Sequence, residues 1–155
     1  MAMTAEGPPI PVEQTLTAVN GMMLAATQGV EYATVDLLLA DLWMGQAELH
    51  KLGACMSVLV YEGRDSVLEG AALPLGILEE IAPQKASFRL KAGQQLFLMS
   101  DGITDVMTEE ELRAACVEAA QEPTAEAAAA LLLQTAVEAI EVPHDDASCA
   151  VIRII

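Results

Sequence analysis

The apolar residues of this chain change their spacing twice along its length, and this change limits the folds that it can adopt. Within 12–28, apolar side chains recur at the spacing of a helix. From 32 to 100, short runs rich in apolar and β-branched residues are separated by turn residues, a pattern typical of strands. The helical spacing returns within 108–140, and an apolar segment closes the chain at 147–155. This order predicts an α+β fold, in which a mainly antiparallel sheet packs with helices.

Turn and cap residues divide these regions further. Gly29 follows the first helical segment, where glycine is favoured past a helix end. Gly63 opens the tight turn 63–65 of a predicted hairpin. Thr108 precedes a run of glutamates that includes Glu110 and Glu111, which is typical of a helix start. We therefore expect strands within 32–45 and 46–52, a hairpin over 56–69, two short strands within 86–100, helices within 108–121 and 125–140, and a buried strand at 147–155.

The length of 155 residues predicts one domain, with a loosely ordered leader at 1–14 and the domain itself at 15–155. Hydrophobic residues make up 54% of the chain, which excludes disorder and is enough for a core. No apolar run approaches the length of about 20 residues that a membrane-spanning helix needs. The first residues lack the basic start and apolar middle of a signal peptide. We therefore expect a soluble, cytoplasmic chain with no membrane contact.

The net charge is −16, from 7 basic and 23 acidic residues. Nucleic acid is excluded as a partner on this ground, because phosphate binding needs a positive face. The same acidity favours cations and basic surfaces, although solubility alone also accounts for most of the carboxylates.

Carboxylates follow or precede apolar strands at two places. Asp101 directly follows the mostly apolar run at 97–100, and Asp145 and Asp146 directly precede the closing strand. Two carboxylates that meet at strand ends repel each other unless a cation lies between them. Hard divalent cations such as Mg²⁺ and Mn²⁺ bind carboxylate oxygen and water without histidine or cysteine. The sequence therefore offers Asp101 and Asp145 as ligands of a divalent metal.

Simpler interpretations of the same residues stay open. Asp101 and Gly102 also fit an ordinary turn, and the acidic pair at 145–146 fits an ordinary loop. His144 could be a ligand, but imidazole does not suit a hard ion. Asp105 could assist the site or cap the following helix, for which Thr108 is better placed.

The sequence contains no other recognisable catalytic pattern. No GxSxG, GxxxxGK[ST], HExxH or CxxC motif occurs, and the only histidines are His50 and His144. The three cysteines lie far apart, so a structural zinc site is not expected.

Four segments resemble one family, the metal-dependent (PPM-type) protein serine/threonine phosphatases. LKAGQQLFLMSDGITD resembles the stretch that carries the family's S-D-G metal aspartate, and HDDASCAVIRI resembles its closing D-D/N-x-T/S strand. AALPLGIL and the segment 33–63 are similar to the proline-leucine-glycine segment and central strands of the bacterial branch. The resemblance covers about 15–154, with the four motifs in the family's order. It implies a partial α-β-β-α sandwich.

The resemblance assigns roles to individual residues. Asp101 matches the S-D-G metal aspartate, and Asp145 matches the first aspartate of the closing motif, which is also a metal ligand. The resemblance implies a centre of two Mn²⁺ or Mg²⁺ ions, which hydrolyses phosphoserine or phosphothreonine on a regulatory protein such as an anti-anti-sigma factor. Asp101 and Asp145 are then both the catalytic and the metal-binding residues.

The chain departs from the family upstream, because nothing in residues 1–14 matches the early D-G-x-G stretch that carries further metal aspartates. We therefore expect the C-terminal portion of a phosphatase domain. It should bind metal weakly, show little or no activity alone, and form a homodimer through unpaired strand edges. Two alternatives stay open: a non-catalytic regulatory or interaction domain on a phosphatase-like scaffold, and an unrelated Mg²⁺-dependent hydrolase.

Overall fold

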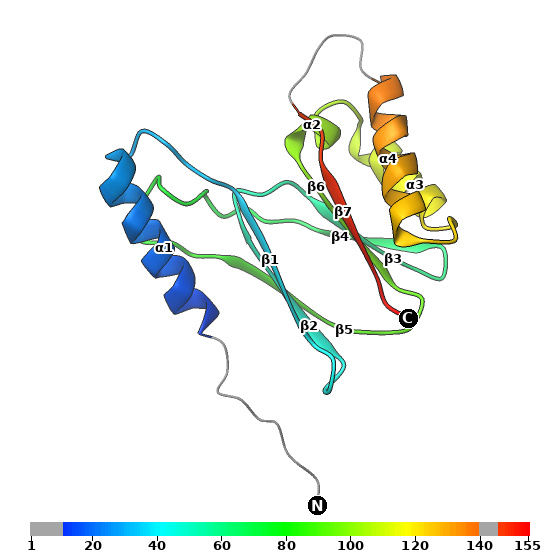
Figure 1. Cartoon of the computed structure of the whole chain (residues 1–155), viewed down its shortest axis with the longest axis horizontal. Helices are drawn as coiled ribbons and strands as arrows, with labels where there is room; N and C mark the ends of the chain where they lie inside the picture. The colour runs from blue at the N-terminus through cyan, green and yellow to red at the C-terminus, as the bar shows by residue number, and fades with distance from the viewer. Residues whose placement is uncertain (1–10, 140–145) are drawn as a thin grey trace, which may run out of the picture.

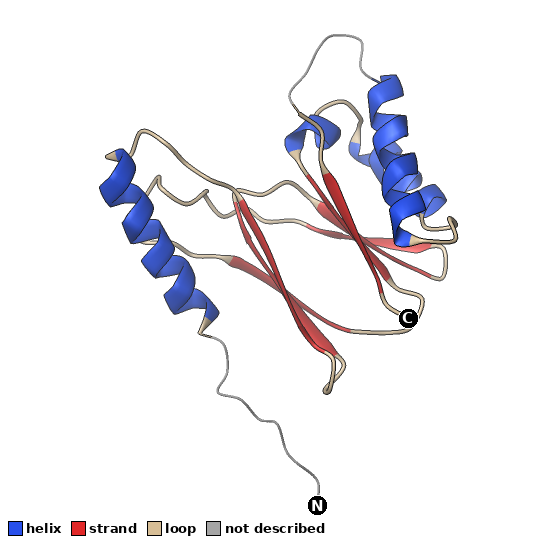
Figure 2. Cartoon of the chain, viewed as in Figure 1, coloured by secondary structure: helices blue, strands red, loops and turns tan. Residues whose placement is uncertain are grey.

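The computed structural model describes residues 11–139 and 146–155, and in this part of the chain two antiparallel sheets lie between helices (Figures 1 and 2). Residues 1–10 and 140–145, including Asp145 and most of the expected leader, lie outside the described residues. The elements in chain order are α1 Val12–Thr27, β1 Val35–Asp41, β2 Gln46–Leu52, β3 Ser57–Tyr61, β4 Arg64–Leu68, β5 Gln84–Arg89, β6 Gln95–Met99, α2 Asp101–Thr104, α3 Glu109–Ala119, α4 Ala125–Ala139 and β7 Cys149–Arg153. The predicted α+β class is confirmed.

The first sheet has the strand order β1-β2-β5, and α1 covers its outer face (Figure 1). Leu16 of α1 is buried against Leu52 of β2, and Val35 and Leu37 of β1 pack on the same cluster. Because side chains alternate across a strand, the residues between them, such as Asp36 and Leu38, face the other sheet.

The second sheet has the order β4-β3-β6-β7, and α3 and α4 cover its outer face (Figure 2). Its core combines Val58 of β3 and Phe97 of β6 with Leu112 of α3 and Leu132 of α4, all essentially inaccessible to solvent. The sequence predicted two strands within 86–100, and both exist. They belong to different sheets, because β5 pairs with β2 and β6 pairs with β3 and β7.

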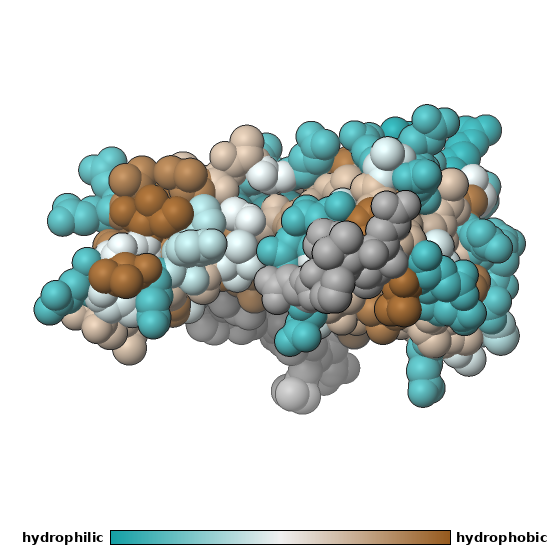
Figure 3. Space-filling view, turned by 90° about the horizontal axis from the view of Figure 1, so that it is seen from above, coloured by the Kyte–Doolittle hydropathy of each residue, from teal (hydrophilic) through white to brown (hydrophobic). Residues whose placement is uncertain are grey.

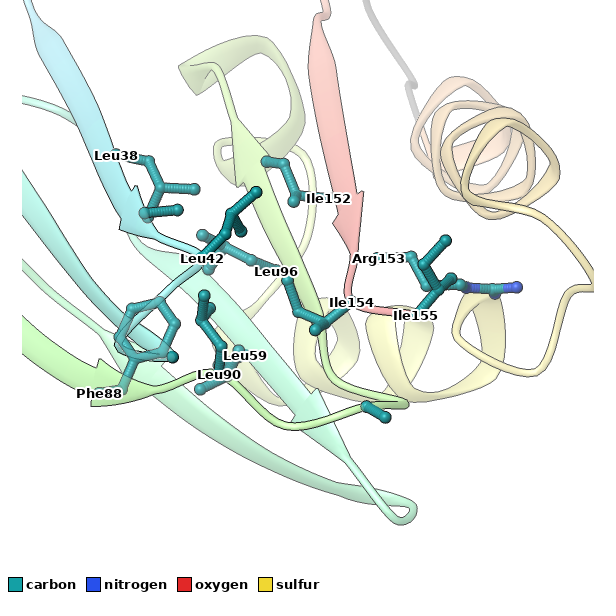
Figure 4. Close-up of a pocket in the computed structure, with 13 residues that line it drawn as sticks. Leu38, Leu42, Leu59, Phe88, Leu90, Leu96, Ile152, Arg153, Ile154 and Ile155 are labelled. Atoms are coloured by element: carbon teal, nitrogen blue, oxygen red, sulfur yellow. The ribbon is translucent and has the colours of Figure 1, made fainter. Parts of the chain in front are cut away.

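The inner faces of the two sheets enclose an apolar hollow of about 570 Å³ (Figure 4). Leu38 of β1 and Phe88 of β5 line it from one sheet, and Leu59, Leu96 and Ile152 line it from the other. β1 and β7 are edge strands, each hydrogen-bonded to one neighbour within the described residues. Both border this hollow, so its rim includes one open edge from each sheet.

Local sequence explains where several elements begin and end. Thr108 accepts a hydrogen bond from the Glu111 N–H at 3.3 Å, while the Glu111 carboxylate accepts one from the Thr108 N–H at 2.8 Å. This capping box confirms the predicted start of α3. The hairpin of β3 and β4 is also confirmed, but it turns at Glu62 and Gly63, both in the left-handed region, one residue before the expected turn. Gln28, and not only Gly29, takes the left-handed conformation after α1.

A fully buried asparagine fixes α1 to the loop that precedes β5. Asn20 donates to the carbonyl groups of Leu78 and Glu79 and accepts from the Gly76 N–H at 2.8 Å.

Apolar side chains gather on the surface at the α1 end of the molecule, as the brown atoms on the left of Figure 3 show. Val30 and Tyr32, just after α1, are 81% and 68% exposed.

Candidate functional site: a pocket beside Asp101 between the sheets

The predicted metal aspartate Asp101 lies where β6 ends and the short helix α2 begins. β6 is buried over almost its whole length, so its backbone position is fixed by the core. Asp101 itself is exposed, and its Oδ1 accepts a hydrogen bond from the Gly102 N–H at 3.0 Å. The buried strand therefore holds an accessible carboxylate at its end, as the sequence predicted. The ordinary turn that Asp101 and Gly102 could also have formed is instead the one-turn helix α2.

Reciprocal hydrogen bonds join the end of β6 to the segment that precedes β7. The Ser100 N–H donates to the Ser148 carbonyl at 2.9 Å, and the Ser148 N–H donates to Ser100 Oγ at 2.9 Å. Ser100 Oγ also lies 3.3 Å from the Asp146 carbonyl. The two aspartate segments, far apart in sequence, therefore meet at one end of the second sheet. The side chain of Asp145 lies outside the described residues, so its convergence with Asp101 stays a prediction.

A pocket of about 390 Å³ opens beside Asp101, between the two sheets. Ser100, Asp101 and Ser148 line one side of it, and Thr34 and Asp36 line the other. β1 and β7 again supply the rim, so this pocket shares its open edges with the apolar hollow. Apolar, alanine, glycine and cysteine residues supply the rest of the lining, which is more apolar than polar. The hydroxyl and carboxylate oxygens at the Asp101 end are the groups in it that a hard cation prefers.

Asp36 is a site residue that the sequence reasoning missed. It lies directly opposite Lys51 in the register of β1 and β2, and Lys51 Nζ is 2.5 Å from its Oδ1. The alternation within 46–52 was the available signal, because Lys51 occupies an inward-facing position of that strand. The segment 32–45 looked like one continuous apolar strand, in which Asp36 did not stand out. Only the pairing of β1 with β2 shows that Asp36 lies opposite Lys51 and faces the pocket.

Two cysteines line the pocket, Cys55 and Cys149, and Cys149 does not offer a thiolate. Its pKa is raised by burial, and its Sγ donates towards the Ala129 carbonyl at 3.6 Å. Burial, together with nearby Cys149, raises the pKa of Cys116 to about 12. Neither of these two thiols is therefore ionised at neutral pH.

The oxygen donors fit a hard divalent cation in kind. Among residues 11–139 and 146–155, however, no three side chains of histidine, cysteine, aspartate or glutamate gather closely enough to hold a metal ion. A hard cation takes roughly six ligands, so a cation at Asp101 needs further protein ligands or water.

Within residues 11–139 and 146–155, no helix is both long and apolar enough to cross a bilayer.

Two facing antiparallel sheets covered by outer helices match the fold of PPM-type (PP2C-type) phosphatase domains. The phosphatase domain of the cell fate determinant SpoIIE from Bacillus subtilis superposes with a TM-score of 0.68 at 25% identity, over 95% of this chain and 67% of that chain. PppA of Pseudomonas aeruginosa gives 0.76 at 19% identity, over 93% and 68%. The catalytic domain of the phosphatase PstP, in complex with two manganese ions, gives 0.71 at 17% identity, over 90% and 68%.

The sequence profile of the family described as "Stage II sporulation protein E (SpoIIE)" matches residues 2–155, and the chain belongs to this family. Stage II sporulation protein E of Bacillus subtilis (strain 168) is 31% identical over 88 residues, and that of Priestia megaterium is 27% identical over 94 residues. These matches cover 57% and 59% of the chain but only 11% and 16% of the two proteins. Family membership removes the unrelated hydrolase from the alternatives.

Proposed function

We propose that this chain forms part of a metal-dependent protein serine/threonine phosphatase domain. Its substrate class is a phosphoserine or phosphothreonine on a regulatory protein such as an anti-anti-sigma factor, in the cytoplasm. The junction between Ser100 and Ser148 carries the proposal, because it brings the segment of Asp146 against Asp101. The SpoIIE phosphatase domain and the manganese-bound PstP domain support it by their shared fold.

Asp101 and Asp145 are the proposed metal ligands and catalytic residues. When bound, Mn²⁺ or Mg²⁺ supplies an activated water and neutralises the charge of the phosphoryl group. The chain's own part is to hold Asp101 at the end of a buried strand, where Ser100 and Ser148 keep the neighbouring backbone in place. Gly102, which has no side chain, would let the backbone approach the ion or its waters closely.

Asp101 and Asp145 alone supply too few protein ligands for two strongly held ions. Mg²⁺ retains its waters and binds weakly to partial sites. We therefore propose that the chain alone binds metal weakly and turns over little substrate. A non-catalytic regulatory domain on the same scaffold is the second candidate, and it is favoured by the lack of a cluster of three metal-ligating side chains among residues 11–139 and 146–155.

Calorimetric titration with Mn²⁺ tests the site. We expect weak binding by the parent chain and its loss in Asp101→Asn and Asp145→Asn. Asp41→Asn is the matched control, because it makes the same charge change at the far end of β1, where Asp41 only caps a turn. Unchanged binding in both site variants would exclude these ligands. Rapid Mn²⁺-dependent dephosphorylation of a phosphoserine protein would instead show that the chain is active alone.

A further inference from the structure

Lys51 has a fully buried ammonium group between the two sheets. Its side chain is 1% exposed, and its Nζ lies 2.5 Å from Asp36 Oδ1 and 2.8 Å from Ser57 Oγ. Asp36 and Lys51 belong to the first sheet, whereas Ser57 begins β3 of the second. The ammonium thus connects the sheets at the end of the sandwich where the pocket beside Asp101 opens.

Stability alone does not account for this charge. Removing an ammonium ion and a carboxylate from water costs several kcal/mol for each ion, and a buried pair recovers this only with good geometry. Well-packed apolar residues would join the sheets equally well. The fold also leaves room for Lys51, since a Cβ at Gly70 would lie only 2.8 Å from Lys51 Cβ. Packing therefore does not explain the buried Lys51–Asp36 pair, whereas a ligand site in the adjoining pocket would.

Asp36 links Lys51 to the pocket, because it contacts the ammonium group and also lines the pocket. Its side chain is 14% exposed and lines the same 390 Å³ pocket as Asp101. Lys51 engages Oδ1, while Oδ2 has no hydrogen-bond partner among the described residues. The ammonium offsets the charge of Asp36, so the pocket gains an oriented oxygen acceptor with little additional repulsion of Asp101.

We propose that Asp36 is a positioning residue of the metal site. Held by Lys51, its carboxylate accepts a hydrogen bond from a water ligand of the divalent cation at Asp101. Such outer partners fix the orientation of a ligand, and their loss typically lowers metal affinity by about 10–100-fold. The inference rests on the proposed function, because it needs a cation at Asp101.

Paramagnetic line broadening by MnCl₂ in the ¹⁵N-labelled chain tests this, since it detects weak binding residue by residue. We expect the amides beside Asp101 to broaden in the parent chain. Asp36→Asn should require about tenfold more Mn²⁺, because the amide oxygen faces Lys51 and its NH₂ group replaces the acceptor. Asp41→Asn, with the same charge change on the same strand, should titrate like the parent.

Lys51→Met distinguishes positioning from simple charge. If Asp36 acts only through its negative charge, removing the ammonium leaves the pocket more negative and should tighten Mn²⁺ binding. If Lys51 holds Asp36 in place, binding should weaken about tenfold. Should Lys51→Met fail to fold, Ser57→Ala removes only one partner of the ammonium and should also weaken binding. Tighter or unchanged binding in the variant that folds overturns the proposal.

The outcomes also separate this inference from the proposed function. Broadening that disappears in Asp101→Asn but is unaffected by Asp36→Asn and Lys51→Met refutes the positioning role alone. Absence of broadening around Asp101 in the parent chain, or broadening that Asp101→Asn leaves unchanged, refutes both the metal site and the inference.

Discussion

Replacing Asn20 by alanine should destabilise the chain by about 3 kcal/mol. The side chain is fully buried and makes three hydrogen bonds to the segment 76–79. Loss of its oxygen leaves the buried Gly76 N–H without a partner, which costs about 1–3 kcal/mol. The freed carbonyl groups of Leu78 and Glu79 belong to exposed residues and can bind water, so each adds at most about 1 kcal/mol. The higher helical propensity of alanine offsets about 0.5 kcal/mol.

Thermal and urea denaturation measure this loss directly. For a chain of this size, about 3 kcal/mol corresponds to a fall in Tm of about 6–12 °C. Thr17→Ala is the matched control on the same helix, because it removes an exposed hydroxyl that bonds only to the Glu13 carbonyl. We expect the control to change stability by less than about 0.5 kcal/mol. An Asn20→Ala loss below about 1 kcal/mol, or an equal loss in the control, would refute the reasoning.

The same substitution should reach the pocket through β1. α1 packs on Val35 and Leu37, whose neighbour Asp36 faces the other sheet. If Asn20 holds α1 in place, Asn20→Ala should increase hydrogen exchange of the β1 amides more than that of the β6 amides, because β6 is covered by other helices. Equal increases in both strands would mean that the helix does not protect β1 selectively.

The remaining predictions concern the start of α3 and the strand edges. Thr108→Ala should lower stability by about 1 kcal/mol in thermal denaturation, and Thr108→Ser should retain it, because serine keeps the hydroxyl of the capping box. The hydrogen bond from the Thr108 N–H holds the pKa of Glu111 below its usual 4.5, so this carboxylate stabilises the folded chain above that pH and loses its effect as the pH falls below it. Glu111→Gln should therefore flatten the acid limb of the stability curve, and an unchanged slope would contradict this. We also predict a dimer that pairs through the edges of β1 and β7, for which light scattering should give twice the 16.4 kDa chain mass, whereas a monomer at all concentrations counts against it.

The sequence predicted the elements better than their assembly. Periodicity located α1, the hairpin and α3, because each is specified by neighbouring residues such as Thr108 and Glu111. It could not assign β5 and β6 to different sheets, since both strands have local patterns that suit either one. Strand pairing depends on partners far along the chain, which no local window contains.

The candidate site divides in the same way. The position of Asp101 at an exposed strand end was predictable, because an apolar run that stops at an acidic residue followed by glycine is a local pattern, whereas its role as a metal ligand stays a prediction. Asp36 was not, because its position in the pocket depends on its register with Lys51 and on the distance to β6 across the sandwich. An aspartate within an apolar strand resembles a solvent-facing residue until the opposite strand supplies its partner.

The acidity of the chain makes equal charge changes the decisive comparison for any metal site. With a net charge of −16, surface carboxylates concentrate divalent cations around the whole molecule, so weak binding alone does not identify a pocket. Asp36→Asn and Asp41→Asn alter this general attraction equally, but only the first changes a group that lines the pocket. Lys51→Met makes the chain more negative and should strengthen the general attraction. Weaker binding in that variant therefore cannot arise from surface charge, and it would locate the cation beside the Asp36 carboxylate that Lys51 holds.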